Sequence, residues 1–248
     1  MNKFMDLEEA GQPIFKDLFK ELERLHLISQ GKFFRLYYKY KHISLSIGGP
    51  VARRWEYPWV IINSEIRKGI KVLDAGCGGS PLLLYLYKMG CLCYGIDNNF
   101  FDEPRGFSSS GIKYRIAAGL SRLYPFYFWF NPHSIEGLSN PGKTLGFSIN
   151  YTKGNLTNIP FHDNTFDRIF CISVAEHLSK EDMLKIAREF NRVLKPGGLL
   201  IATIDCWGTG LFWKDFVRES ALDLEGELNL TPPEKNYDYN VIGLTLRK

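Results

Sequence analysis

The sequence has little of what marks a secreted, membrane-spanning or metal-bound protein. No stretch approaches the roughly 18 apolar residues that a membrane-spanning helix needs, and the N-terminus has no apolar run suited to a signal peptide. The five cysteines form neither an even disulfide framework nor a zinc-binding Cys-x-x-Cys pair. We therefore expect a reducing compartment, with the cytoplasm as the location, and no metal site.

A strong charge of either sign is also lacking. The formal net charge is +4, which is too small to indicate a nucleic-acid partner by itself. What is present is the composition of a folded protein, with 45% hydrophobic residues in a chain of 248. A chain of this size fits one α/β domain, with or without a cap, and buries a core without disulfides.

Three zones divide the chain. Residues 1–70 are predicted to form a helical N-terminal lead-in or cap, in which apolar residues at helical spacing predict an amphipathic helix over 14–28. Residues 71–248 are predicted to form the core. An irregular, aromatic-rich insert at 98–148 interrupts that core.

The core alternates strand-like and helix-like segments. Short apolar runs predict strands at 72–75, 91–96, 150–154, 166–172, 199–204 and 240–246, and helices at 82–89 and about 180–194. Because the strands are nearly uniformly apolar, they fit a parallel sheet that helices cover on both faces. The predicted fold class is therefore α/β, with a doubly wound, mostly parallel sheet.

A glycine turn follows the first strand of this core. In a doubly wound sheet, ligands bind at the carboxyl ends of the strands, where the strand order reverses. The turn Gly76–Ser80 lies at such an end, and glycines let backbone N–H groups approach a ligand closely. Asp97 ends the next strand, where a carboxylate can accept hydrogen bonds from both hydroxyls of a ribose. Together these residues predict an adenosine-containing ligand.

The glycine turn departs from two well-known nucleotide motifs. A dinucleotide site requires Gly-x-Gly-x-x-Gly, and here Pro81 stands in place of the third glycine. A phosphate-binding Walker loop requires Gly-Lys followed by Ser or Thr, and the chain has no such triplet.

Five segments resemble the motifs of one family, in that family's order. They are Val72–Gly79, Gly95–Asp97, Gly154–Asp167, Glu176–Leu178 and Arg192–Gly198. They resemble the class I S-adenosylmethionine-dependent methyltransferases, most closely the broad type-11-like subgroup. The resemblance implies a Rossmann-like fold, S-adenosyl-L-methionine as the cofactor and transfer of its methyl group to an acceptor.

The resemblance also implies roles for individual residues. Asp74 and the backbone of Gly76, Cys77 and Gly78 would hold the methionine part, Asp97 the ribose, Asn98, Asn155 and Leu156 the adenine, and Cys171 and Ile172 would line the methionine side. One residue departs from the family, which often has Asp at the position of Asn155. An amide can still accept a hydrogen bond from the adenine amino group, but without the help of a charge.

His177 follows the fourth strand, near the expected position of the methyl group. It is a candidate general base toward the acceptor, and the alternative is a residue at a helix start that only bonds the backbone. Its neighbour Glu176 is interpreted as a first-turn acid that complements a helix dipole. Ahead of the first strand, Trp55 or Tyr57 is expected to contact the cofactor.

Two aromatic segments leave the acceptor open. Residues 32–54 carry six Lys or Arg and no acid, which suits either RNA binding or a helix with solvated lysines. Residues 124–130 suit a lipid interface, an apolar acceptor pocket or a cap on the core. We expect a methyltransferase acting on a small-molecule or lipid-like acceptor. The alternatives are an RNA methyltransferase that uses 32–54 and a non-catalytic binding module, and the oligomeric state stays open.

Overall fold

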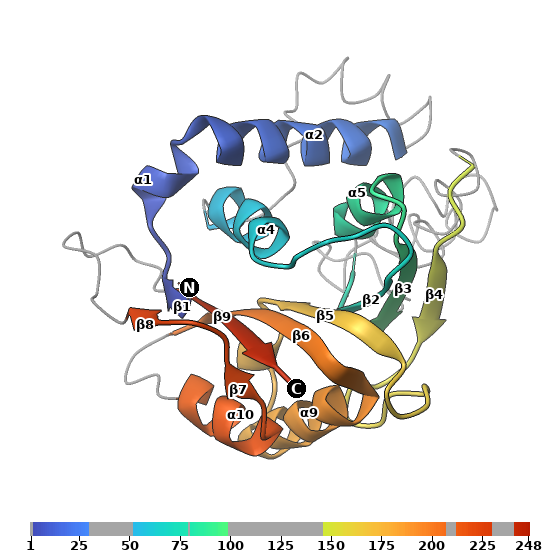
Figure 1. Cartoon of the computed structure of the whole chain (residues 1–248), viewed down its shortest axis with the longest axis vertical. Helices are drawn as coiled ribbons and strands as arrows, with labels where there is room; N and C mark the ends of the chain where they lie inside the picture. The colour runs from blue at the N-terminus through green and yellow to red at the C-terminus, as the bar shows by residue number, and fades with distance from the viewer. Residues whose placement is uncertain (1, 30–51, 79, 99–145, 207–211, 230–240) are drawn as a thin grey trace, which may run out of the picture.

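A computed structural model describes residues 2–29, 52–78, 80–98, 146–206, 212–229 and 241–248 (Figure 1). Most of the basic segment 32–54, most of the insert 98–148 and the whole aromatic cluster 124–130 lie outside the described residues, so the hypotheses attached to them stay predictions. Among the described helices, none is both long and apolar enough to cross a membrane.

The described strands form one sheet. They are β1 (Asn2–Phe4), β2 (Lys71–Ala75), β3 (Leu92–Asp97), β4 (Asn150–Lys153), β5 (Phe166–Ile172), β6 (Leu194–Asp205), β7 (Asp223–Leu224), β8 (Leu228–Asn229) and β9 (Val241–Arg247). Their order is β4-β3-β2-β5-β6-β9-β1-β8, with β7 paired to β9. Strands β2 to β6 pair in parallel, whereas β9 runs antiparallel to β6. The mostly parallel, doubly wound sheet is thereby confirmed.

Helices cover both faces of this sheet. They are α1 (Leu7–Ala10), α2 (Pro13–Ser29), α4 (Arg53–Ile62), α5 (Leu82–Lys88), α9 (Lys180–Val193) and α10 (Phe212–Ser220), with a short 3-10 helix η1 (Ala175–His177). Figure 1 shows α2, α4 and α5 over one face and α9 and α10 over the other. Neighbouring residues of β2 divide between the two faces, because Val72 packs in the cluster that contains Trp55 and Leu73 in the cluster that contains Phe190.

The N-terminal lead-in also contributes a strand, which the sequence did not predict. β1 pairs antiparallel with β9, with Lys3 opposite Gly243. The side chain of Asn2 is fully buried and bonds its neighbours twice: it donates to the Glu225 carbonyl at 3.0 Å and accepts from the Thr245 N–H at 2.5 Å. These bonds satisfy the buried amide of Asn2 and attach the N-terminal lead-in to strand β9 and the segment after β7.

Strand β6 begins earlier than expected. The sequence predicted a strand over 199–204 after a break at Lys195–Gly198, whereas β6 already starts at Leu194. Its register to β5 shifts between Phe166 and Arg168, so the break is an irregularity within the strand rather than a loop before it.

Candidate functional site

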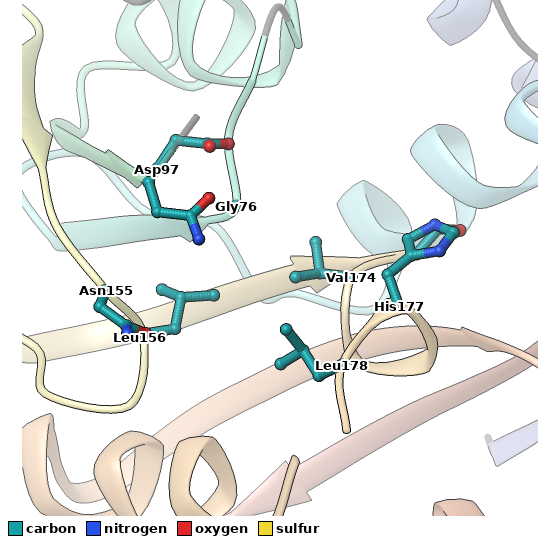
Figure 2. Close-up of a pocket in the computed structure, with 9 residues that line it drawn as sticks. Gly76, Asp97, Asn155, Leu156, Val174, His177 and Leu178 are labelled. Carbon is teal, nitrogen blue, oxygen red and sulfur yellow. The ribbon is translucent and has the colours of Figure 1, made fainter. Parts of the chain in front are cut away.

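A cavity of about 360 Å³ opens at the carboxyl ends of the parallel strands. It lies where the strand order reverses, between the chain that leaves β2 toward β3 and the chain that leaves β5 toward β6. Its lining residues are Gly76, Asp97, Asn98, Asn155, Leu156, Ser173, Val174, His177 and Leu178. Figure 2 shows Asp97, Asn155 and Leu156 on one side of the cavity and Val174, His177 and Leu178 on the other.

The glycine turn packs tightly against one wall of this cavity. The Gly76 N–H donates to the Ile96 carbonyl at 2.8 Å, and the residue has a φ of +79°. A Cβ atom at Gly76 would come within 2.5 Å of Val174 Cγ2. Because both the backbone conformation and the space exclude a side chain, the turn requires glycine here.

The turn also fixes the carboxylate of Asp97. The Gly78 N–H donates to Asp97 Oδ2 at 2.9 Å, a hydrogen bond that the negative charge strengthens. This contact joins the end of β3 to the turn after β2, two segments whose association the sequence predicted. It leaves the acid on the cavity wall, where a ligand with hydroxyl groups can reach it.

Asp74 lies beneath the same turn. Its side chain is 3% exposed, and Oδ2 has no hydrogen-bond partner among the described residues. Burial, followed by repulsion from Asp97, raises the pKa of Asp74 to about 7, against the opposing effects of the Ser80 hydroxyl and Arg53. Asp74 therefore carries a proton part of the time at neutral pH.

The loop after β4 carries Asn155 and Leu156, the residues expected to meet the adenine. Asn155 Oδ1 accepts from the Thr157 N–H at 3.0 Å, which orients the exposed amide at the cavity. The oxygen keeps a second lone pair for a ligand. Leu156 is 8% exposed and offers an apolar surface beside it.

The strand end on the methionine side differs from the expectation. Cys171 and Ile172 are 0% and 8% exposed and do not line the cavity; Ser173 and Val174 do so instead. The reason is that β5 stays buried through Ile172, and Ser173, with a φ of +49°, turns the chain out of the sheet.

The structure leaves both interpretations of His177 open. Its backbone N–H donates to the Val174 carbonyl at 3.1 Å, and its side chain is exposed and lines the cavity. Glu176, in contrast, is not a simple first-turn acid. Both of its carboxylate oxygens are buried without a hydrogen-bond partner among the described residues, and burial is the main cause that raises its pKa to about 8.

Glu56 is a buried residue that the sequence did not single out. Its fully buried carboxylate accepts from Ser173 Oγ at 2.6 Å, Thr203 Oγ1 at 2.7 Å and Arg53 Nη1 at 2.8 Å. It thereby joins α4 to the ends of β5 and β6, next to the cavity. The available signal was an acid inside the otherwise apolar run 55–60.

The two aromatic residues expected to contact the cofactor separate in the structure. Trp55 is fully buried and donates through Nε1 to Glu9 Oε2 at 3.0 Å, so it belongs to the packing of α1 on α4 and does not line the cavity. Tyr57 is buried and shares a side-chain hydrogen bond with Ser80 of the glycine turn. Of these two residues, Tyr57 is therefore the one that joins helix α4 to the glycine turn.

Comparisons with known proteins agree with this geometry. A family described as a methyltransferase domain matches residues 130–202, which include Asn155 and His177 but not the glycine turn. The chain is 28% identical over 155 residues to a sterol 24-C-methyltransferase of Pneumocystis carinii, covering 62% of this chain and 32% of that protein. It is 28% identical over 172 residues to one of Schizosaccharomyces pombe, covering 69% and 35%. The chain thus spans about a third of the length of these curated relatives.

Solved structures share the fold at low sequence identity. The [4+2]-cyclase SpnF superposes with a TM-score of 0.55 at 17% identity, covering 77% of this chain and 79% of that one. A TehB-like SAM-dependent methyltransferase from Corynebacterium glutamicum superposes with a TM-score of 0.53 at 17% identity, covering 87% and 98%. At such identities the likeness establishes the fold, and fold alone does not fix the chemistry. With the family match over residues 130–202 and the fold taken together, the chain is similar to the class I S-adenosylmethionine-dependent methyltransferases.

Proposed function

We propose that the protein binds S-adenosyl-L-methionine and transfers its methyl group to a small, lipid-like acceptor. The observation that carries this proposal is the Asp97 carboxylate, held by the Gly78 N–H on the wall of a cavity that also presents apolar side chains. A nucleoside needs both: an acceptor for its ribose hydroxyls and an apolar surface for its base. Leu156, Val174 and Leu178 supply that surface.

The proposed roles follow the positions of the side chains. Asp97 binds the ribose, Asn98 and Asn155 the edge of the adenine, and Leu156 its face. The backbone of Gly76, Cys77 and Gly78, with Asp74 beneath it, holds the methionine part. Since Ser173 and Val174 line the cavity in place of Cys171 and Ile172, they take over the methionine side.

Methyl transfer requires little from the protein beyond the positioning of the cofactor and the acceptor. The bound cofactor supplies an electrophilic methyl group on a positively charged sulfur. The protein must hold the acceptor in line with it, about 3 Å away, and exclude water, which contributes several kcal/mol. For an acceptor that loses a proton, His177 is the proposed base, because its side chain lines the cavity at the end of β5.

The lipid-like acceptor is inferred from the relatives. The curated proteins that match are named sterol 24-C-methyltransferases, so a sterol or another apolar small molecule is the first acceptor class to test. All five cysteines are free thiols, which agrees with a reducing compartment, and we propose the cytoplasm.

The first test is binding. Calorimetric titration with S-adenosylmethionine and S-adenosylhomocysteine should give micromolar affinity, and Asp97→Ala should abolish it. The matched control is Asp163→Ala, because Asp163 is 68% exposed and lies outside the cavity wall. A well-folded wild type that binds neither compound would contradict the proposal.

The second test is transfer. Protein is incubated with methyl-labelled S-adenosylmethionine and, separately, a sterol dispersed in detergent, a prenyl diphosphate and RNA. Label in the organic extract of the sterol or prenyl reaction supports the proposal. Label on RNA would instead favour the alternative that uses residues 32–54, and binding without transfer to any acceptor would favour a binding module.

A further inference from the structure

Asp74 is a buried acid beside the glycine turn whose hydrogen bonds are incomplete. It lies in β2, two residues before Gly76, and its Oδ2 atom is buried without a partner among the described residues. We propose that Asp74 holds a proton in the free protein and releases it when the ammonium group of the cofactor binds, so that cofactor binding is coupled to proton release at neutral pH. This inference rests on the proposed function, because it requires that cofactor.

The hydrogen bonds around the turn distribute charge unequally between two acids. Asp97 Oδ2 accepts the Gly78 N–H at 2.9 Å, which stabilises a carboxylate. Among the described residues, Asp74 has the Ser80 hydroxyl as its side-chain partner and no comparable backbone donor. Two nearby acids of like charge seldom both ionise at low dielectric, and burial together with repulsion from Asp97 keeps the proton on Asp74.

Among the described groups that interact electrostatically with Asp74, Arg53 is the one cation, and burial and Asp97 outweigh its effect on the pKa of Asp74. These groups are Arg53 and Tyr57 from α4, Ser80 and Cys77 from the turn, Cys93 and Asp97 from β3, Tyr151 from β4 and Cys171 from β5. Burial raises the pKa of each of these thiols and phenols, so they are neutral at pH 7. The guanidinium of Arg53 already donates a hydrogen bond to the Glu56 carboxylate at 2.8 Å.

An ammonium group changes this balance. A cation beside a carboxyl stabilises its ionised form, so the pKa of Asp74 falls and its proton leaves to the solvent. The exchange is balanced: the neutral carboxyl and the ammonium ligand give a carboxylate–ammonium pair and one free proton. Because the pKa is higher in the free protein than in the complex, affinity rises about tenfold per pH unit below about pH 7 and levels off above it.

The experiment measures protons rather than turnover. S-adenosylhomocysteine is titrated into wild-type protein at pH 6.5 in two buffers of different ionisation enthalpy, and the difference in observed enthalpy gives the protons released per ligand. With a pKa of about 7, we expect release of about 0.75 proton. The pH stays below about 7.5 because a free α-amino group itself titrates near 7.7–8.0.

Two controls assign the proton to Asp74. Asp74→Asn should bind with almost no proton release. His177→Gln is chosen because His177 is another side chain on the cavity wall that can carry a proton, and this variant should release as much as the wild type. Methylthioadenosine, which lacks the ammonium group, should bind the wild type without proton release. That ligand comparison needs no variant and holds even if Asp74→Asn does not fold.

The outcomes separate this inference from the function beneath it. Binding of S-adenosylhomocysteine without any dependence on the buffer would overturn the role of Asp74 and leave the methyltransferase proposal intact. Full proton release by a folded Asp74→Asn variant, or by the wild type with methylthioadenosine, would overturn it as well. Absence of binding by both S-adenosylhomocysteine and methylthioadenosine would overturn both proposals together.

Discussion

Acids at the amino ends of the parallel strands and acids at their carboxyl ends have pKa shifts of opposite sign. At the amino ends, Asp167 accepts from the Lys71 N–H at 2.8 Å and from Lys195 Nζ at 2.8 Å. Burial alone would raise its pKa, but these bonds outweigh that effect and lower it. At the carboxyl ends, the carboxyls of Asp74 and Glu176 have buried oxygens without partners among the described residues, and their pKa values rise to about 7 and about 8.

The amino-end edge is a closed network of charges. Arg247 bonds Glu225 at 2.6 Å and Glu65 at 3.1 Å, and Arg168 donates to the Ser64 carbonyl at 2.6 Å. Such pairing satisfies the charged groups described at this edge. At the carboxyl-end edge, buried carboxyl oxygens of Asp74 and Glu176 have no partner among the described residues, which costs stability and is the condition under which perturbed pKa values indicate a functional site.

The largest expected difference between the two edges concerns glycine. Gly76 and Gly197 share a left-handed backbone, with φ of +79° and +74°. A Cβ at Gly76 would strike Val174 at 2.5 Å, whereas a Cβ at Gly197 meets nothing within 4 Å. We expect Gly76→Ala to lower the free energy of unfolding by about 3 kcal/mol and to weaken cofactor binding at least tenfold, because Val174 lines the cavity.

Gly197→Ala serves as the matched control, with backbone strain of about 1 kcal/mol and unchanged affinity. Urea denaturation and calorimetric titration of both variants measure the contrast. Equal losses of stability and affinity in the two variants would show that the turn at Gly76 needs no more space than the one at Gly197.

The next prediction removes an acid from the paired edge. Asp167→Asn weakens the bond to Lys195 and should lower the free energy of unfolding by about 2 kcal/mol at pH 7. Because the folded-state pKa is lowered, the contribution is present above the unfolded pKa of about 3.9 and is lost as the pH falls through the folded value.

Denaturation of Asp167→Asn and wild type at pH 7 and at pH 3 checks this dependence, and the stability difference should shrink at the lower pH. Cofactor affinity at pH 7 should match the wild type. A large loss of affinity would mean that the two edges are not separable.

Glu176, at the carboxyl-end edge, should change the stability with pH in the opposite direction. Its folded pKa is raised, so the folded protein binds more protons than the unfolded chain, and wild-type stability falls as the pH rises from about 4.3 toward 8. Glu176→Gln removes that dependence. Relative to the wild type, the variant should gain roughly 1 kcal/mol or more between pH 5 and pH 8, because the buried carboxylate of the wild type ionises over this range at a cost in folding free energy.

Thermal or urea unfolding at those two pH values measures the gain for Glu176→Gln. Glu181→Gln is the matched control, since the side chain of Glu181 is 79% exposed, and it should show no such change. A stability difference that stays constant from pH 5 to pH 8 would contradict a raised pKa at Glu176.

The sequence predicted those parts of the molecule that depend on local pattern. Apolar runs that end in Gly76 or Asp97 mark both a strand and its carboxyl end, so the sheet core and the contact between the glycine turn and Asp97 could be anticipated. A displacement of two residues separates the predicted Cys171 and Ile172 from Ser173 and Val174, which line the cavity, and the contact of either pair with the cofactor stays a prediction. The source of the displacement is the length of β5, since strand ends are poorly encoded in apolar runs.

What escaped prediction depends on contacts between distant segments. β1 is only three residues long, and its pairing with β9 joins the two ends of the chain, which no local periodicity reveals. The burial of Glu176 and the bonds of Glu56 arise where α4 packs against the ends of β5 and β6. An acid beside a histidine or inside an apolar helix carries no local sign of whether its partner will be solvent or the protein interior.

The smallest expected effect concerns Glu225, which forms an exposed ion pair at the amino-end edge. Glu225 bonds Arg247 at 2.6 Å, and this bond lowers its pKa, but its side chain is 42% exposed. Exposed pairs contribute about 0.5 kcal/mol or less, and Arg247 keeps its bond to Glu65. Glu225→Gln should therefore change the midpoint of urea unfolding only slightly at low salt and not at all in 1 M salt, where exposed charges are screened. A loss well above that size would mean that the amino-end charges act as one cooperative network, and the edge would then stabilise the sheet through its connectivity rather than through the well-bonded Asp167 alone.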